Sequence, residues 1–391
     1  MTASIWALFV AMTLWFPFRR GPLGFGIFVV TMAFNEIPAV LLGVFLVSVA
    51  ASFTDAAADG LAAVVTALGV SCLVTFGLVW LQLRARNVRP ALEAALNTGL
   101  GTNWRASVRS EVGLDAGLTT PWGRGILQPF QRHVASVERV RNVPYGSGGR
   151  AHLLDIYRRK DRATGKDRVT KRPVLIHLHG GGFVRGGKSR EGVTLLNQLA
   201  DHGWLCVSAN YGLRSQGTFP QPLVDTKRII AWLRDHADEL GGDPDQIFLV
   251  GGSAGGHLAV SAALTAQDSR FQPGFEGVDT TVAGAVALYG YLGPRSPDPA
   301  SSPLNLTRPD APPVMIVCGA RDTTIPPAGP RSVATSLAVM SNSPVVYAEL
   351  PDTQHSFDLF ASVRARVVAS AVEAFLDWAR SDEPTGCAVT R

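Results

Sequence analysis

The chain has 391 residues, of which 47% are hydrophobic, and a formal net charge of +5. Its arginines and lysines are spread out, without a dense basic run or interleaved aromatic residues, which argues against nucleic-acid binding. The four cysteines, Cys72, Cys206, Cys318 and Cys387, lie far apart without CxxC spacing, which argues against a zinc site or a disulfide scaffold.

The hydrophobic excess is concentrated at the start of the chain. Residues 61–83 are 23 consecutive positions without a charge, which is long enough for a helix that crosses a bilayer. Residues 37–53 are a second uncharged run, and residues 1–18 are a third apolar run. The sequence therefore predicts a transmembrane region over residues 1–84 with about three helices, the middle one drawn from residues 22–53. Four segments, one of them short and re-entrant, are an alternative.

Two other interpretations of these runs are weaker. A cleaved signal peptide would need a basic start and a small-residue cleavage site, and residues 1–18 have neither. Buried core helices would explain one short apolar run better than several long runs in succession.

The basic flanks of the apolar runs predict an orientation. Arg19 and Arg20 close the first run, Arg84 and Arg86 follow the last one, and arginines favour the cytoplasmic face. With three crossings the N-terminus lies outside and everything after residue 84 lies inside. We therefore expect an integral, multi-pass membrane protein whose large C-terminal part is cytoplasmic, although one crossing more or fewer would reverse that side.

The rest of the chain divides into three parts. Residues 85–135 carry charges, turn formers and short helical patterns, and we interpret them as a linker with a small cap-like helical layer. Over residues 136–380, short β-type runs such as PVLIHLHG, QIFLVGG and PVMIVCGA alternate with amphipathic stretches of helical length. This alternation predicts an α/β fold, a mostly parallel sheet with helices on both faces. Residues 381–391 are predicted to be a disordered tail.

The stretch FLVGGSAGGHLA places a single serine, Ser253, between pairs of glycines. An apolar strand-like run precedes it and a helix-forming run follows it, and the sequence GGSAG fits G-x-S-x-G. A serine in a strained turn between strand and helix needs glycine two positions away on either side, here Gly251 and Gly255, because side chains would clash there. Its hydroxyl then lies at a helix N-terminus, where developing negative charge is favoured. A glycine-rich turn with an incidental serine is the alternative interpretation.

The segment HLHGGGF follows another strand-like run and supplies candidate donors for an oxyanion. Consecutive glycines let the backbone N–H groups of Gly181 and Gly182 point into a site, and the N–H of Ala254 is the expected third donor. His179 and Gly180 belong to the same motif and support this interpretation. A phosphate-binding loop is disfavoured because neither GxGxxG spacing nor a following GK[ST] is present.

A serine nucleophile needs a histidine to take its proton and an acid to orient the imidazole. His355 follows the last strand-like run and is the last of eight histidines, as the chain order Ser, Asp, His requires. Asp322 follows the run PVMIVCGA and lies between the other two. We therefore predict a catalytic triad of Ser253, Asp322 and His355. The rival acids are Asp268, Asp279, Asp298, Asp310 and Asp352.

With these residues identified, residues 136–380 resemble the α/β-hydrolase superfamily and, within it, the hormone-sensitive-lipase-like carboxylesterases with an HGGG oxyanion motif. The segments ANYGL (209–213), FPQPLVDTKRIIAWL (219–233) and DPDQIFLVGGSAGGHLA (243–259) are similar as well. The family usually carries an acidic residue directly before the serine, where this chain has Gly252. Because the triad is intact, that departure affects the subfamily and the substrate rather than the chemistry.

The resemblance implies hydrolysis of carboxylic esters through an acyl-enzyme, without a metal or a cofactor, in a pocket roofed by a cap. Residues 85–135 and 291–312 are the candidates for that cap. The expected partners are a small-molecule or lipid ester and membrane lipid, and membrane attachment favours apolar esters. An amidase or peptidase with the same triad is an alternative. A non-catalytic α/β-hydrolase scaffold is a third interpretation, and it predicts a broken triad position, whereas all three positions are filled here.

Overall fold

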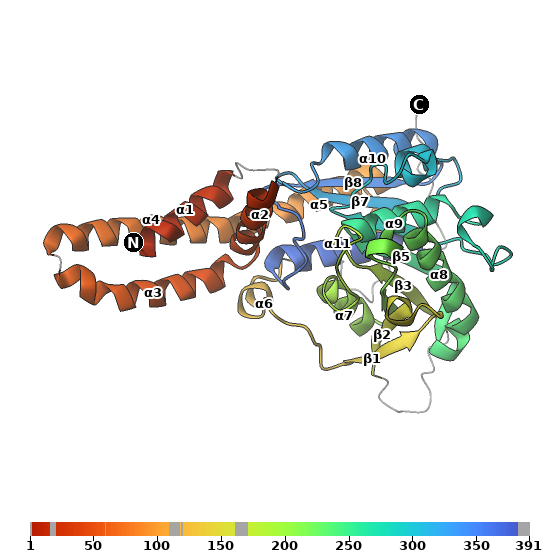
Figure 1. Cartoon of the computed structure of the whole chain (residues 1–391), viewed down its shortest axis with the longest axis horizontal. Coiled ribbons are helices and arrows are strands. Elements are labelled where there is room, and N and C mark those ends of the chain that lie inside the picture. Colours follow the sequence, from red (N-terminus) through yellow and green to blue (C-terminus); the bar gives the residue numbers. More distant parts are fainter. Residues whose placement is uncertain are drawn as a thin grey trace.

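An arm of N-terminal helices projects from a globular part built on a β-sheet (Figure 1). The arm consists of α1 (Thr2–Trp15), α2 (Gly21–Glu36), α3 (Pro38–Ala58) and α4 (Leu61–Arg84). This computed structural model describes residues 2–15, 21–58, 60–108, 118, 120–160 and 171–381. All but the first residue of the predicted tail 381–391 lies outside the described residues.

The globular part contains one eight-stranded sheet in the order β1-β2-β4-β3-β5-β6-β7-β8. β2 pairs antiparallel with β1 and β4, and all other neighbouring strands are parallel. The α/β fold expected from the alternation of strand and helix patterns is therefore confirmed. The strands are β1 (Val137–Pro144), β2 (Leu153–Arg159), β3 (Arg172–Leu178), β4 (Leu205–Ala209), β5 (Gly242–Gly252), β6 (Gly284–Leu288), β7 (Val314–Gly319) and β8 (Val345–Leu350).

The parallel strands are continuous apolar runs because helices cover both of their faces. In β3, Val174 and Ile176 belong to the core that contains α8 and α9, whereas Leu175 belongs to the core that contains α5, α7 and α11. Successive side chains thus alternate between the two cores, as a strand requires. The helices around the sheet are α5 (Val88–Leu100), α6 (Trp122–Leu127), α7 (Val193–Asp201), α8 (Gln221–Leu240), α9 (Ala254–Leu264), α10 (Ala328–Met340) and α11 (Val363–Ala379).

Helix α5 is part of the globular core. Its buried residues Val88, Leu92, Leu96 and Leu100 follow the i, i+4 spacing of one helix face, and they share a core with β8 and α11. None of the described residues within 85–135 lines the cavity beside Ser253. The apolar stripe of α5 is thus buried against the sheet, and the cap-like interpretation of residues 85–135 stays a prediction.

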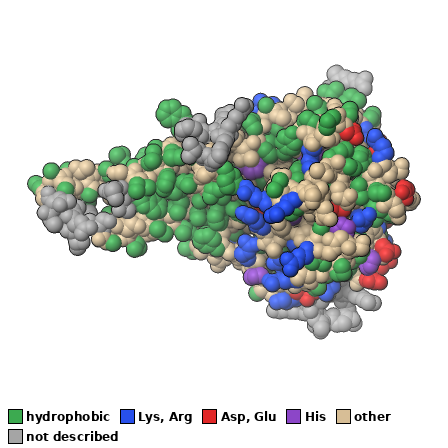
Figure 2. Space-filling view, in the orientation of Figure 1, with side chains coloured by type: hydrophobic (Ala, Val, Ile, Leu, Met, Phe, Trp, Pro, Cys, Tyr) green, Lys and Arg blue, Asp and Glu red, His purple; other side chains and the backbone are tan. Residues whose placement is uncertain are grey.

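The arm is apolar on its outside as well as inside. Phe45, Val74 and Leu78 fill the space between its helices, while Leu73 and Phe76 of α4 are 70% and 68% exposed. Figure 2 shows hydrophobic side chains over much of the described surface of the arm. Exposed apolar surface of this extent is unusual on a soluble monomer and typical of a membrane or protein contact.

The expectation of about three membrane crossings is not supported. Among the described residues, one continuous helix, Leu61–Leu100, is long and apolar enough to span a bilayer. A second span exists only if Gly24–Glu36 and Pro38–Ala51, which are bent by 97° at their junction, count together as one broken helix. The helix of α1 is shorter than a bilayer core requires. The cytoplasmic assignment rested on an odd number of crossings and loses that basis.

Candidate active site

Ser253 lies in a sharp turn between β5 and α9. Its backbone has φ 52° and ψ −113°, a strained conformation for a residue with a side chain. Three backbone hydrogen bonds hold the turn: the Ser253 N–H donates to the Leu288 carbonyl over 2.9 Å, and the Ser253 carbonyl accepts from the N–H groups of His257 and Tyr291, each over 3.2 Å. A Cβ on Gly251 would lie 2.2 Å from Gly255 backbone atoms, and one on Gly255 would lie 1.9 Å from the Leu178 carbonyl oxygen. The flanking glycines are thus required sterically.

The structure brings the three residues of the predicted triad together. Ser253 Oγ lies 3.1 Å from His355 Nε2, and His355 Nδ1 lies 2.6 Å from Asp322 Oδ2. Because the carboxylate can only accept, Nδ1 carries the proton and Nε2 is left to accept from the serine hydroxyl. Both Asp322 and His355 are buried, so water competes little for either contact.

Further hydrogen bonds fix the positions of Asp322 and His355 relative to each other. Asp322 Oδ1 accepts from the N–H groups of Thr324 and Ile325 over 2.8 and 2.7 Å, which fixes the carboxylate after β7. The Gln354 side-chain oxygen accepts from Thr323 N–H and from His355 N–H, over 2.8 and 2.9 Å. One buried amide therefore ties the acid loop to the histidine loop. No sequence motif points to Gln354, although it directly precedes His355.

The rival acids are engaged elsewhere. Asp352 forms ion pairs with Arg84 and with Arg321, and its side chain is not a partner of His355. The other four bind local groups: Asp268 pairs with Arg270, Asp279 with Arg234, Asp310 with Arg308, and Asp298 caps a short helical turn.

Three other histidines near the site are buried and are held in the neutral form. Burial lowers the pKa of His177 and His257 to about 3 and that of His179 to about 4. The His179 ring stacks on Tyr211 at 4.4 Å between centroids, and its Nδ1 donates to the Gly180 carbonyl. His179 thus shapes the glycine loop and does not exchange protons near neutral pH.

The glycine loop after β3 lies beside the serine. Gly181 and Gly182 have φ of 119° and 63°, values that side chains disfavour, and both line the same cavity as Ser253 and Ala254. Within the described part of the chain, no partner accepts from the backbone N–H groups of Gly181, Gly182 or Ala254. These amides are available to an oxyanion. The preceding Gly180 N–H donates to Glu191 Oε2 over 2.7 Å, which anchors the loop.

Behind the serine, Tyr289 occupies the space next to Gly252. A Cβ on Gly252 would lie 2.5 Å from the Tyr289 hydroxyl oxygen, and that hydroxyl donates to the buried carboxylate of Asp358. The Tyr289 ring also meets the His355 ring edge to face, with 4.7 Å between centroids. Tyr289 and Asp358 belong to none of the catalytic motifs, so the sequence alone does not indicate them. Burial raises the pKa of the Asp358 carboxyl.

A cavity of about 650 Å³ opens over Ser253 and His355. The glycine loop and Tyr291, Pro294 and Arg295 form part of its lining; the last three belong to the segment 291–312, whose role as a cap stays a prediction. A further part of the wall was not expected from the sequence: α2 contributes four apolar side chains from the N-terminal arm. These are Phe25, Phe28, Val29 and Met32.

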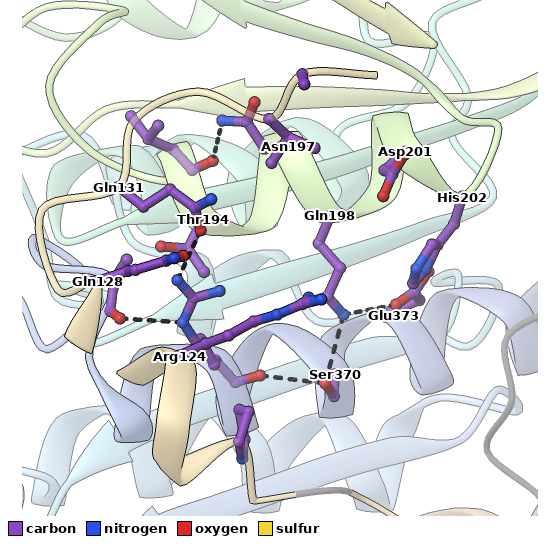
Figure 3. Close-up of a pocket in the computed structure, with 16 residues that line it drawn as sticks. Arg124, Gln128, Gln131, Thr194, Asn197, Gln198, Asp201, His202, Ser370 and Glu373 are labelled. Carbon is purple, nitrogen blue, oxygen red and sulfur yellow. Dashed lines mark hydrogen bonds and ion pairs between the residues drawn. The ribbon is translucent and has the colours of Figure 1, made fainter. Parts of the chain in front are cut away.

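A second hollow, of about 460 Å³, lies between α6, α7 and α11 (Figure 3). Polar side chains line it: Gln198 donates to Glu373 over 2.7 Å, and His202 Nδ1 lies 2.6 Å from the same carboxylate. Arg124, Gln128 and the other labelled residues surround them. None of the predicted triad or oxyanion residues lines this hollow, so the predicted chemistry belongs to the cavity over Ser253.

The sheet order and the strand–serine–helix turn define an α/β-hydrolase. The family model BD-FAE matches residues 154–292. The chain is 37% identical over 334 residues to Esterase LipQ of Mycobacterium tuberculosis, an alignment that covers 77% of this chain and 76% of that protein. It is 38% identical over 334 residues to the Probable carboxylic ester hydrolase LipM of the same organism, covering 78% and 76%. The chain belongs to the hormone-sensitive-lipase-like carboxylesterase family.

A solved structure agrees on the fold. The truncated form of a carbohydrate esterase from gut microbiota superposes with a TM-score of 0.51 at 20% identity, covering 61% of this chain and 96% of that one. The match covers most of that esterase but only part of this chain, which is longer.

Proposed function

We propose that this carboxylic ester hydrolase is a serine esterase that uses Ser253 as nucleophile, His355 as general base and acid, and Asp322 to orient the imidazole. The observation that carries the proposal is the 3.1 Å separation between Ser253 Oγ and His355 Nε2 beside three free backbone amides. The family relationship supports ester hydrolysis as the reaction.

In the first half-reaction, His355 Nε2 takes the Ser253 proton while Oγ attacks the ester carbonyl carbon. The oxyanion accepts hydrogen bonds from the N–H groups of Gly181, Gly182 and Ala254; removing one such donor typically costs about 3 kcal/mol of transition-state stabilisation. Protonated His355 then gives its proton to the leaving alcohol as the C–O bond breaks. Asp322 stabilises the imidazolium during these steps.

In the second half-reaction, water replaces the alcohol. His355 Nε2 takes a proton from the water, whose oxygen attacks the acyl carbon, and the same amides hold the second oxyanion. The proton returns to Ser253 Oγ as the acyl–oxygen bond breaks and the carboxylic acid leaves. The sum is ester plus water giving acid plus alcohol, and this chain's own residues supply every proton transfer.

The test is covalent labelling of the full chain with a fluorophosphonate. We expect the wild type to be labelled and Ser253→Ala to remain unlabelled, with ester hydrolysis reduced about 10⁶-fold. Ser356→Ala is the matched control, because Ser356 lines the same cavity and should keep its labelling. Labelling that survives in Ser253→Ala would show that another residue is the nucleophile. Matched ester and amide substrates distinguish the esterase from the amidase or peptidase alternative.

We also propose that the N-terminal arm attaches this esterase to a membrane. The support is the continuous helix Leu61–Leu100, whose first part is apolar and exposed and whose last part is built into the globular core. The same helix therefore links the anchor directly to the catalytic part. Membrane lipid is then a partner of the arm.

A further inference from the structure

The cavity over Ser253 has two walls of opposite chemistry. One is the apolar face of α2, where Phe25 and Val29 are 48% and 42% exposed although they are large and hydrophobic. Met32 on the same face is buried close to the site. An alkyl chain that lies along this wall removes apolar surface from water on both partners, which is the general source of affinity in such pockets.

The other wall carries three guanidinium groups, those of Arg185, Arg190 and Arg295. Among the described residues, none of the three has a carboxylate within ion-pair distance. The guanidinium of Arg185 lies 4.5 Å from the ring centre of Phe25, and that of Arg295 lies 3.2 Å from that of Phe183. Stacking on a ring restrains a guanidinium while its edge keeps N–H donors for an anion.

The described acid that lines the cavity forms no ion pair with these arginines. Glu191 is the one carboxylate outside the triad among the described lining residues, and its Oε2 already accepts from Gly180 N–H. Burial, reinforced by nearby Asp358, raises the pKa of Glu191, while the Gly180 N–H and the charge of Arg190 act in the opposite direction. Arg295 is half-buried and also donates to the Gly217 carbonyl; its pKa, lowered by burial to about 10, still leaves it charged at neutral pH.

From these two walls we infer that the substrate is an amphiphilic ester, with an alkyl chain against α2 and a carboxylate or phosphate group against Arg185, Arg190 and Arg295. This inference rests on the proposed esterase function and adds the substrate class. A neutral short-chain ester would use neither the exposed apolar wall nor the three cations. Figure 2 shows Lys and Arg side chains gathered on the globular part next to the arm, so an anion approaching along the arm meets positive potential.

The first experiment compares matched soluble esters on the full chain in neutral detergent. One pair carries the anion on the alcohol side, 4-octanoyloxybenzoate against 4-octanoyloxybenzamide; the other carries it on the acyl side, mono-4-nitrophenyl suberate against 4-nitrophenyl octanoate. For at least one pair, we expect Arg185→Gln/Arg295→Gln to lower the anionic-to-neutral ratio of kcat/KM about tenfold, the equivalent of one charge-assisted hydrogen bond. The anionic-to-neutral ratio of the double variant is divided by that of the wild type, so the intrinsic reactivity of each ester cancels.

The control is Arg150→Gln, which removes an exposed arginine that does not line the cavity and should leave the ratio unchanged. An unchanged ratio in the double variant for both pairs, together with no arginine dependence in the vesicle assay described next, overturns the inference, while continued hydrolysis leaves the esterase proposal intact. If the wild type hydrolyses none of the four esters, the proposed function fails instead.

A second experiment distinguishes the source of the anionic ester. Vesicles of phosphatidylglycerol and of phosphatidylcholine with identical acyl chains are supplied to the wild type and the double variant, and released fatty acid is measured. Faster release from phosphatidylglycerol that depends on the arginines supports the inference with a membrane lipid as source. Arginine dependence only with the soluble esters supports it with a soluble source, and no dependence in either assay overturns it.

Discussion

At the residue scale, Tyr289 explains how the chain accommodates Gly252 where related enzymes usually carry an acid. The Tyr289 ring packs edge to face on His355, and its hydroxyl occupies the space that a side chain at position 252 would need. The carboxylate that receives this hydroxyl, Asp358, comes from the loop after His355. An acid is therefore present behind the serine in space, although it is missing from the position that the motif predicts.

This packing predicts that Gly252→Ala destabilises the chain. The added Cβ would lie 2.5 Å from a hydroxyl that is buried and hydrogen-bonded, and overpacking of this kind costs about 1–3 kcal/mol. Thermal unfolding of the full chain should show a lower Tm, and esterase activity should fall because the ring that supports His355 must move. Gly329→Ala is the control: Gly329 lies in α10 with no atom within 4 Å of its added Cβ. The same Tm for Gly252→Ala and Gly329→Ala would contradict this packing argument.

The sequence was sufficient to predict which residues would meet, and insufficient to predict what holds them. Ser253, Asp322 and His355 each follow a strand-like run. Because the carboxyl ends of parallel strands lie at one edge of a sheet, their positions in the chain were enough to predict that they lie close together. Gln354 and Tyr289 act through contacts with segments distant in the sequence, and no local pattern encodes such contacts. The catalytic roles themselves stay predictions until the labelling experiment is done.

At the element scale, helix α2 does more than attach the arm. Its Asn35 Nδ2 donates to the Asp352 carbonyl over 3.0 Å, and Gln354 Nε2 lies 3.4 Å from Thr31 Oγ1. Both contacts fall on the loop that carries His355. The loop between β8 and α11 is therefore held on one side by the sheet and on the other by the arm.

A buried ion pair completes this contact. Glu36 at the end of α2 accepts from Arg364 Nη1 over 2.6 Å and from Ser362 Oγ over 2.7 Å, and both charged side chains are almost fully buried. Removing one partner of such a pair leaves an uncompensated buried charge, whereas replacing both can be close to neutral. Position 36 is thus coupled to the start of α11, directly after the histidine loop.

We accordingly predict that Arg364→Met lowers the free energy of unfolding by about 3 kcal/mol and that Glu36→Gln/Arg364→Met recovers most of the loss. The rate of fluorophosphonate labelling should fall and recover in parallel, since the pair anchors the histidine loop. Arg331→Met, which breaks the exposed pair with Glu349, is the control and should cost less than about 1 kcal/mol. A double variant as unstable as the single one would rule out this coupling.

The contact between α7 and α11 predicts a pH dependence of stability. His202 Nδ1 lies 2.6 Å from Glu373 Oε1, and this hydrogen bond raises the pKa of the histidine. A raised pKa means that the stabilisation is fully present below about pH 6.5, the ordinary histidine value, and is lost as the pH rises through the raised value.

We therefore expect His202→Gln to lower the free energy of unfolding, measured by urea denaturation, more at pH 6 than at pH 9. Because the His202 side chain is 37% exposed, the loss of unfolding free energy should be larger at pH 6 by about 0.5 kcal/mol. His133→Gln, at an exposed histidine, serves as the matched control. Equal differences at the two pH values would mean that the pair does not stabilise the fold.

At the scale of the whole molecule, the sheet could be predicted from the sequence and the arm could not. For residues 136–380, the alternating strand and helix patterns and the two glycine motifs are compatible with few fold topologies. The apolar runs before residue 84 carry no comparable signal, because hydropathy alone does not show that α2 and α3 bend by 97° or that α2 reaches the catalytic cavity. The described helices therefore do not support the predicted number of crossings.

The exposed apolar surface of the arm leads to a prediction about the whole molecule. A chain held by a membrane-embedded helix should stay in the membrane pellet through an alkaline carbonate wash and be released by a non-ionic detergent. Leu73 and Phe76 of α4 are exposed, and a lysine near the middle of a membrane helix costs about 3 kcal/mol. Leu73→Lys/Phe76→Lys should therefore shift much of the chain to the carbonate supernatant. Val339→Lys, at a 79% exposed position of α10, adds charge outside the arm and should leave the distribution unchanged. Wild-type chain in the carbonate supernatant would mean that the apolar face of the arm contacts something other than a bilayer.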